Sequence, residues 1–433
     1  MSSLLGHLQC ALGPDTRRIC VAFSGGMDSR VLLELTRQLQ WAQPLKKQHP
    51  QLQIRALHIH HQLSPHADQW AAFCQEVCDA AGIPLSIQCV NPNQWPGASL
   101  EDRARKARYS VFEQQLQPDE LLLQAHHQDD QAETLLLRLL RGAGTLGLSS
   151  IPKQRPLGQG LLLRPLLDIP RAELLAFATA EKLQWIEDES NQQTHFDRNF
   201  LRLQVLPLLQ QRFPAVSQNL ARVTQHATES QQLNRELAEL DLQPCRNTET
   251  SLSIPPLMAL SSHRRFNLLR HWLLLRGLTL PGHTLWEQLD KLCLARKDAN
   301  PLVSWGESTQ RIEARRFQQQ LFIAPEEYFQ PLPANWQQDW DGKMPIQTPV
   351  GLINFRLLAS DSLPTASLTF TLRARQGGET LRQKNRGQRD VKRLLQELHL
   401  PPWERQRLVF IWLQKELIAV GSKLVAAGWT IEY

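Results

Sequence analysis

The sequence has no run of 18 apolar residues, the length that a membrane-spanning helix needs. Its first residues also lack the basic region and the small-residue cleavage site of a secretion signal. Proline and glycine are not in excess, and hydrophobic residues make up 42% of the 433-residue chain. We therefore expect a folded cytoplasmic protein of roughly two or three domains, with no membrane anchor.

Cysteine is scarce and scattered, with seven residues and no CxxC pair. An odd number of cysteines without a secretion signal argues against a disulfide framework. Cys74 and Cys78 lie four residues apart on an expected helix, but no second pair of ligands accompanies them. We interpret them as buried apolar residues and not as a zinc site.

Acidic residues are few in one C-terminal stretch, residues 371–411, which holds ten Lys or Arg against four Asp or Glu. This excess equals the net charge of +6 of the whole chain. Positive charge gathered in one segment indicates a polyanion partner, and a solvated charged face is the alternative interpretation. The candidate phosphate-binding residues are Arg373, Arg375, Arg382, Lys384, Arg386, Arg389, Lys392 and Arg393.

The order of apolar and amphipathic stretches predicts the fold class. Up to about residue 188, short strands at 19–23, 54–60, 85–90 and 120–125 alternate with helices, which is typical of an α/β fold with a doubly wound parallel sheet. Helices then dominate, with a helical pattern at about 198–240. A proline-rich linker or extended loop region is expected at 325–349, and the last eighty residues suggest a small α+β domain. The predicted domains are residues 1–215, 216–325 and 345–433.

The most informative motif is Ser24-Gly25-Gly26-Met27-Asp28-Ser29, between an expected strand and an expected helix. Glycines let the backbone approach a phosphate, and the free amides of a helix N-terminus bind anions. Asp28 would repel phosphate unless it held a cation, which predicts Mg²⁺ there. The motif has no Walker lysine, so it is not that of a P-loop NTPase, and an ordinary glycine-rich turn is the alternative.

A second polar cluster, His126-His127-Gln128-Asp129-Asp130-Gln131-Ala132-Glu133-Thr134, follows another expected strand. Polar groups at the carboxyl ends of parallel strands face one crevice, so this cluster should meet the glycine-rich loop. On a helix, Asp129, Asp130 and Glu133 would share a face, where they require a cation, either a metal or an amine. An acidic helix cap is the alternative interpretation.

A third motif, residues 101–109, places Arg105 and Arg108 on one helical face. Guanidinium groups so spaced can meet a phosphate with paired hydrogen bonds, or they can simply be a charged helix surface.

The motif Ser24–Ser29 resembles the PP-loop of the ATP-pyrophosphatase superfamily, in the adenine nucleotide α-hydrolase-like class. Together with the second and third motifs, and with residues 58–64, 141–148, 164–166, 188–191 and 198–202, residues 15–215 resemble the tRNA(Ile)-lysidine synthetase family. The C-terminal half is similar in architecture, with Arg375-Gln376-Gly377-Gly378-Glu379 in its small domain. One departure is Gln62-Leu63-Ser64, where many relatives have Gly-Leu-Arg; it weakens any phosphate role at position 64.

The resemblance implies ligation of L-lysine to C2 of the wobble cytidine of an isoleucine tRNA with a CAU anticodon. ATP would first adenylate the cytidine, and the lysine amine would then displace AMP. By this resemblance the PP-loop residues Ser24, Gly25, Gly26, Met27, Asp28 and Ser29 bind ATP, with Mg²⁺ on Asp28. Arg105 and Arg108 contact the phosphate or the adenylate, and Asp130 and Glu133 bind lysine, with Glu133 as the expected base. His126 and His127 are nearby polar groups, the C-terminal basic residues bind tRNA, and a homodimer is left open.

Three rival functions fit the sequence less well. A PP-loop tRNA thiolase usually needs a cysteine pair or a cluster, and no CxxC is present. Amidotransferase relatives need a nucleophilic cysteine near the N-terminus, but residue 2 is Ser. A non-catalytic RNA-binding protein would have no use for the intact acids of the first two motifs.

Overall fold

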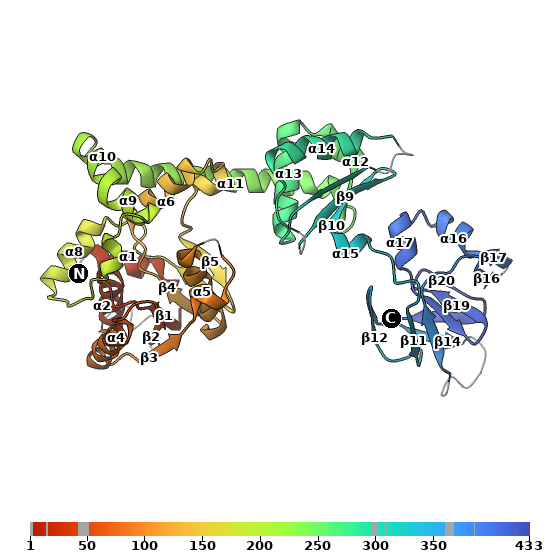
Figure 1. Ribbon diagram of the computed structural model, residues 1–433, viewed down its shortest axis with the longest axis horizontal. Helices are drawn as coiled ribbons and strands as arrows, with labels where there is room; N and C mark the ends of the chain where they lie inside the picture. Colours follow the sequence, from red (N-terminus) through yellow and green to blue (C-terminus); the bar gives the residue numbers. More distant parts are fainter. Residues whose placement is uncertain are drawn as a thin grey trace. The chain divides into compact units, whose positions relative to one another are not determined.

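The computed structural model describes residues 3–13, 16–41, 52–97, 99–296, 301–307, 310–359, 368–384 and 386–433. The chain divides into two compact units, Met1–Leu233 and Asn234–Tyr433. Figure 1 shows the first in red to green and the second in green to blue. Within the described residues, no helix is long and apolar enough to cross a membrane.

The first unit is built on a six-stranded sheet with the order β3-β2-β1-β4-β6-β5. All neighbouring pairs are parallel except β5 and β6, which form an antiparallel hairpin at the edge. The strands are β1 (Arg18–Ala22), β2 (Gln53–His60), β3 (Leu85–Cys89), β4 (Glu120–Leu123), β5 (Gln154–Leu157) and β6 (Gly160–Leu163).

Helices cover both faces of this sheet (Figure 1). On one face, Val31 of α2 and Leu174 of α8 join the larger core, and on the other, Phe112 of α5 packs with Leu122 of β4. The expected doubly wound α/β fold is therefore confirmed. The helices are α1 (Ser3–Ala11), α2 (Met27–Trp41), α4 (Ala67–Ala81), α5 (Leu100–Gln115), α6 (Gln128–Leu140), α7 (Thr145–Leu148) and α8 (Arg171–Ala180).

The edge hairpin β5–β6 is not among the strands expected from the sequence. Its strands have four residues each, and the apolar run of β6 is too short to distinguish from the end of a helix by periodicity. The turn between them uses Gly158 at φ 55, a left-handed conformation that glycine adopts freely.

A helical segment follows, as the pattern of residues 198–240 predicts. It consists of α9 (Asp197–Phe200), a π-helical turn η3 (Leu201–Val205), α10 (Leu206–Arg212) and the long α11 (Val216–Cys245).

The first part of the second unit combines the end of α11 and further helices with a four-stranded sheet, β7-β10-β9-β8. Trp272 and Leu289 lie in its core. The helical middle domain is thus observed, with a sheet added. The elements are β7 (Ser251–Ser253), α12 (Ile254–Ala259), α13 (Ser262–Leu275), α14 (His283–Leu294), β8 (Leu302–Trp305), β9 (Ile312–Phe317) and β10 (Gln320–Pro325).

The last part of the chain is a small strand-rich domain around the sheet β11-β15-β18-β19-β20, as the predicted α+β class requires. Two short helices and three two-stranded ladders complete it. Its elements are β11 (Gln337–Trp340), β12 (Ile346–Thr348), β13 (Gly351–Ile353), β14 (Arg356–Ala359), β15 (Phe370–Arg373), β16 (Thr380–Gln383), β17 (Gly387–Asp390), α16 (Val391–Glu397), α17 (Pro402–Arg407), β18 (Phe410–Leu413), β19 (Glu416–Val420), β20 (Leu424–Val425) and β21 (Trp429–Glu432).

The linker expected at residues 325–349 is wrong for much of that range. It contains the helix α15 (Glu326–Phe329), the strand β12, and β11, which pairs with β15. Trp340 at the end of β11 is buried in the core of the small domain. The prolines misled because none of them interrupts a strand: Pro325 is the last residue of β10, and Pro345 and Pro349 flank β12.

Candidate active site

The PP-loop motif forms the turn from β1 into α2, at the carboxyl end of the central strand. The hydroxyls of its two serines, Ser24 and Ser29, are hydrogen-bonded to each other at 3.1 Å. Ser29 Oγ also donates to Gly26 O at 2.9 Å. The amides of Ser24 and Gly26 also donate to these hydroxyls. The loop is therefore shaped before any ligand arrives.

Gly25 is required by close packing. It adopts φ 86, and a Cβ there would lie 2.5 Å from Ile186 Cδ1 and 3.0 Å from Cys74 Sγ. Its carbonyl accepts a hydrogen bond from the amide of Ile186 at 2.9 Å. Any side chain would therefore displace the loop from the segment that holds it.

Cys74 and Cys78 are buried, as the sequence interpretation expects, and burial raises the pKa values of their thiols to about 12 and about 11. Within the described ranges, no group of three or more His, Cys, Asp or Glu residues could hold a metal ion.

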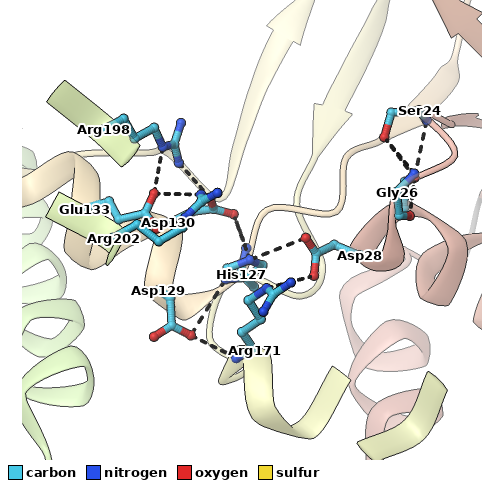
Figure 2. Close-up of polar contacts among 11 residues, drawn as sticks. Ser24, Gly26, Asp28, His127, Asp129, Asp130, Glu133, Arg171, Arg198 and Arg202 are labelled. Atoms are coloured by element: carbon cyan, nitrogen blue, oxygen red, sulfur yellow. Dashed lines mark hydrogen bonds and ion pairs between the residues drawn. The ribbon is translucent and has the colours of Figure 1, made fainter. Parts of the chain in front are cut away.

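Asp28 occupies the first turn of α2 and faces the acidic cluster (Figure 2). Its Oδ2 lies 3.6 Å from His127 Nε2, and its Oδ1 lies 3.9 Å from Arg171 Nε. Oδ1 is buried and accepts no hydrogen bond. One free carboxylate oxygen beside a phosphate-binding loop suits Mg²⁺, which is commonly bound by one or two carboxylates together with substrate phosphates.

His127 stands at the start of α6, surrounded by carboxylates. Its ring nitrogens lie 3.5 Å from Asp130 Oδ2 and 3.8 Å from Asp129 Oδ2, in addition to the contact with Asp28. Burial opposes the charged ring, but Asp130 and Asp28 outweigh burial and raise the pKa of His127. The acids of the two motifs are therefore bridged by a histidine whose surroundings favour its charged form.

The remaining cations for the acidic cluster are arginines of the chain itself. Glu133, almost fully buried, accepts hydrogen bonds from Arg202 Nε at 2.6 Å and Arg198 Nε at 2.7 Å. Arg198 Nη2 also donates to Asp130 Oδ1 at 2.6 Å (Figure 2). Burial alone would raise the pKa of Asp130. The charges of His127 and Arg198 outweigh burial and lower this pKa from its ordinary value of 3.8 to about 2.

Residues 198–202 are part of the family resemblance, but the sequence alone assigns them no role. Arg202 lies in the π-helical turn η3, directly after α9, and both guanidinium groups reach the same carboxylate. Such π-helical turns are frequent at functional sites. The four-residue spacing of two arginines was the available signal, but nothing in the sequence paired them with α6.

Asp129 shares His127 with Asp130, but its hydrogen-bond donor is not one of the two arginines that hold Asp130 and Glu133, although all three acids were expected on one helical face. Its Oδ2 accepts a hydrogen bond from the backbone amide of Arg171, the first residue of α8, at 2.9 Å (Figure 2). The free amides at the N-terminus of α8 attract this carboxylate away from the other two.

The arginines of the third motif lie on α5. Arg105 rests over the ring of Tyr109, with Cζ 5.1 Å from the centroid. The Nε of Arg108 is buried and has no hydrogen-bond partner. Burial and the nearby charges of Arg105 and Arg198 lower the pKa of Arg108. A buried cation facing other cations favours an anionic ligand.

The segment Gln62-Leu63-Ser64 begins in a strained backbone conformation. Gln62 adopts φ 56, a left-handed conformation that favours glycine. Ser64 is used locally, because its Oγ accepts the amide of His66 at 3.1 Å.

Most of the basic residues expected to bind nucleic acid are exposed. Arg382 and Arg389 lie on the hairpin β16–β17, and Lys392 and Arg393 lie on α16. Lys384 and Arg386 are also exposed, whereas Arg373 and Arg375 are half-buried. These residues belong to the second unit, and the PP-loop belongs to the first.

Three family models match the chain. They are the PP-loop domain over residues 4–209, the TilS substrate binding domain over residues 252–322 and the TilS substrate C-terminal domain over residues 370–432. The domain boundaries predicted from the sequence stay predictions.

Curated relatives resemble the whole chain. A tRNA(Ile)-lysidine synthase of Xanthomonas axonopodis pv. citri (strain 306) is 41% identical over 411 residues, covering 94% of this chain and 90% of the relative. That of Serratia proteamaculans (strain 568) is 40% identical, covering 96% and 93%. A solved U34-tRNA thiolase, NcsA from Methanococcus maripaludis, aligns with a TM-score of only 0.41 at 16% identity, over 52% of this chain and 78% of that one, too weak a likeness to argue from. With 41% identity across nearly its whole length, the chain belongs to the tRNA(Ile)-lysidine synthase family.

Proposed function

We propose that this protein ligates L-lysine to C2 of the wobble cytidine in the CAU anticodon of an isoleucine tRNA. ATP is consumed and AMP and pyrophosphate are released, so that the tRNA reads AUA as isoleucine. The observation that carries the proposal is the link between the PP-loop and α6: His127 lies 3.6 Å from Asp28 and 3.5 Å from Asp130. The PP-loop thus adjoins an acidic cluster that suits an amine, in a chain of this family, and this supports the proposal.

In the first step, the cytosine oxygen attacks the α-phosphate of ATP. The PP-loop amides and the hydroxyls of Ser24 and Ser29 hold the pyrophosphate. Asp28, whose Oδ1 accepts no hydrogen bond from the described residues, would hold Mg²⁺, and the ion would neutralise phosphate charge. Arg105 and Arg108 bind the phosphate or the adenylate, which would give Arg108 Nε the acceptor that the protein does not provide.

In the second step, the ε-amine of lysine displaces AMP from the adenylated cytidine. A free lysine side chain, with a pKa of about 10.4, is neutral in only about one molecule in 2,500 at pH 7, so a carboxylate must hold the ammonium and a base must take its proton. We assign Asp130 and Glu133 to the ammonium and Glu133 to the proton. Since both oxygens of Glu133 accept from arginines, one contact with Arg198 or Arg202 must open first.

The C-terminal basic residues bind the tRNA backbone, and the target base is unstacked into the site. All residues assigned to the chemistry lie between positions 24 and 202 of one chain, so the proposal holds for a monomer or a homodimer. We also propose that the protein acts in the cytoplasm.

The decisive experiment incubates the protein with ATP, isotope-labelled lysine and an isoleucine tRNA with a CAU anticodon, followed by nucleoside mass spectrometry. Labelled lysine on the wobble cytidine supports the proposal. The control is the same tRNA with a UAU anticodon, which has no cytidine to modify. No label in the CAU tRNA, or equal label in both tRNAs, overturns the proposal.

A further inference from the structure

Arg164 is a buried cation that has no anionic partner among the described residues. It is 2% exposed, and it follows β6 directly. Its guanidinium donates to Pro152 O at 2.6 Å, to Tyr109 Oη and Gln124 Oε1 at 3.2 Å each, and to His126 Nδ1 at 3.2 Å. None of these acceptors is charged. A buried arginine that bonds only neutral groups is costly, so the charge itself deserves an explanation.

The contact with His126 determines where the proton of that imidazole lies. A guanidinium group has hydrogen-bond donors and no acceptor. His126 Nδ1 must therefore accept, and the proton of the neutral ring must lie on Nε2. Among the described residues, no group bonds Nε2 of His126. The ring thus presents one free N–H donor.

The surroundings also keep this ring uncharged. Burial lowers the pKa of His126 to about 3, and Arg164, Arg198 and Arg108 contribute in the same direction against Asp130. The neighbouring His127 has the opposite environment, since three aspartates raise its pKa. The two adjacent histidines therefore have opposite surroundings: those of His126 keep its ring neutral, and those of His127 favour the charged form.

We propose that Arg164 is a positioning residue that locks His126 as an Nε2–H hydrogen-bond donor to an oxygen of the reacting substrate, a phosphate or cytosine oxygen. His126 then binds and orients that oxygen and carries no proton between groups. This inference rests on the proposed function, because the substrate oxygen belongs to that reaction. It gives Arg164 a role besides anchoring the segment that follows β6.

A pair of substitutions at His126 separates a donor from a proton carrier. The amide nitrogen of Gln lies near the position of Nε2 and is a donor that never titrates. We expect His126→Gln to form lysidine with a kcat within about 10-fold of the unchanged enzyme, and His126→Leu to lose about 100-fold, as for loss of one preorganised donor. Equal losses in both variants overturn the donor role.

The second experiment reads the tautomer directly, by nitrogen NMR of the full chain with labelled histidine. His126 is identified by the signal missing from His126→Gln. We expect its Nε2 to be protonated and its Nδ1 unprotonated, without titration between about pH 5.5 and 8. Arg164→Met should mix the two tautomers and raise the pKa of His126, whose charged neighbours are then Asp130, Arg108, Arg198 and His127.

Arg155→Met is the matched control, since Arg155 lies 4.8 Å from the centroid of the same Tyr109 ring without touching His126. The control should leave the tautomer unchanged. A proton on Nδ1 in the unchanged protein, or an unchanged tautomer in Arg164→Met, overturns the inference. Because this readout needs no turnover, it decides the inference even if the protein forms no lysidine, an outcome that overturns the proposed function alone.

Discussion

Two regions of the chain are rich in arginine, and they differ in the surroundings of the guanidinium groups. Arg198 and Arg202 are largely buried in the active site, where they form hydrogen bonds of 2.6 to 2.9 Å to one carboxylate. Arg382 and Arg389 of the C-terminal hairpin are exposed to solvent. Buried charges interact through a low dielectric and fix geometry, whereas exposed charges are screened and act additively. Substitutions should therefore have large, specific effects in the first region and small, uniform ones in the second.

Asp28→Asn is expected to have the largest effect, because it removes the charge beside the phosphate loop while keeping the shape. We expect tRNA-dependent pyrophosphate release to fall by about 1,000-fold or more, a loss comparable with or larger than that of one preorganised electrostatic group. Release is measured without lysine, so that only adenylation is observed. Asp168→Asn, an exposed aspartate paired with Lys153, is the control. Normal release by Asp28→Asn would contradict the assigned role.

Glu133→Gln tests the lysine step separately. We expect lysidine formation to fall by about 100-fold, because the neutral amide can neither hold an ammonium nor accept a proton. Pyrophosphate release without lysine should stay within a few fold, since the PP-loop is intact. Glu173→Gln, an exposed residue of α8, is the control. If both steps fell equally, Glu133 would serve the site as a whole and not the amine.

Asp130→Asn tests the stability of the fold and its dependence on pH, and its expected effect is smaller than the two above. The pKa of Asp130 is depressed in the folded state, from 3.8 to about 2. The carboxylate thus stabilises the fold above its unfolded pKa, and this contribution is lost as the pH falls through the folded pKa. At about 1.4 kcal/mol per unit, we expect Asp130→Asn to cost about 2 kcal/mol of unfolding free energy at pH 5 to 7. Urea unfolding measures it, and a difference that does not shrink below pH 4 would refute the linkage.

The comparison also shows what the sequence could and could not predict. Strand–helix alternation located β1 to β4, and the glycine-rich string located the PP-loop, because both signals are local. The pairing of Glu133 with Arg198 and Arg202 was missed, since it joins residues 65 and 69 positions apart through tertiary packing. A role for Arg164 could not be predicted for the same reason: its four acceptors come from three separate segments, and only Gln124 and His126 are close to each other in the sequence.

The elements found within residues 325–349, where a linker was expected, affect how the proposed tRNA binding of the second unit can be tested. Truncation from residue 349 would remove β15, the partner of β11, and expose Trp340. It would also remove Trp403, which packs on Phe322 and Phe329. Loss of tRNA binding after such a truncation would report misfolding as readily as a lost contact. Single exposed charges are the better test.

Arg389→Gln should therefore have the smallest effect. Its side chain is exposed and its Nε bonds only the carbonyl of Arg386, so folding should not change. We expect tRNA affinity to fall by a few fold, with the slope of log K against log salt reduced by about 1, as for loss of one phosphate contact. Arg356→Gln, an exposed arginine of β14 outside the basic segment, should change neither. An unchanged salt slope in Arg389→Gln would remove this residue from the tRNA surface, and a loss confined to one tRNA sequence would mean that it reads a base and not the backbone.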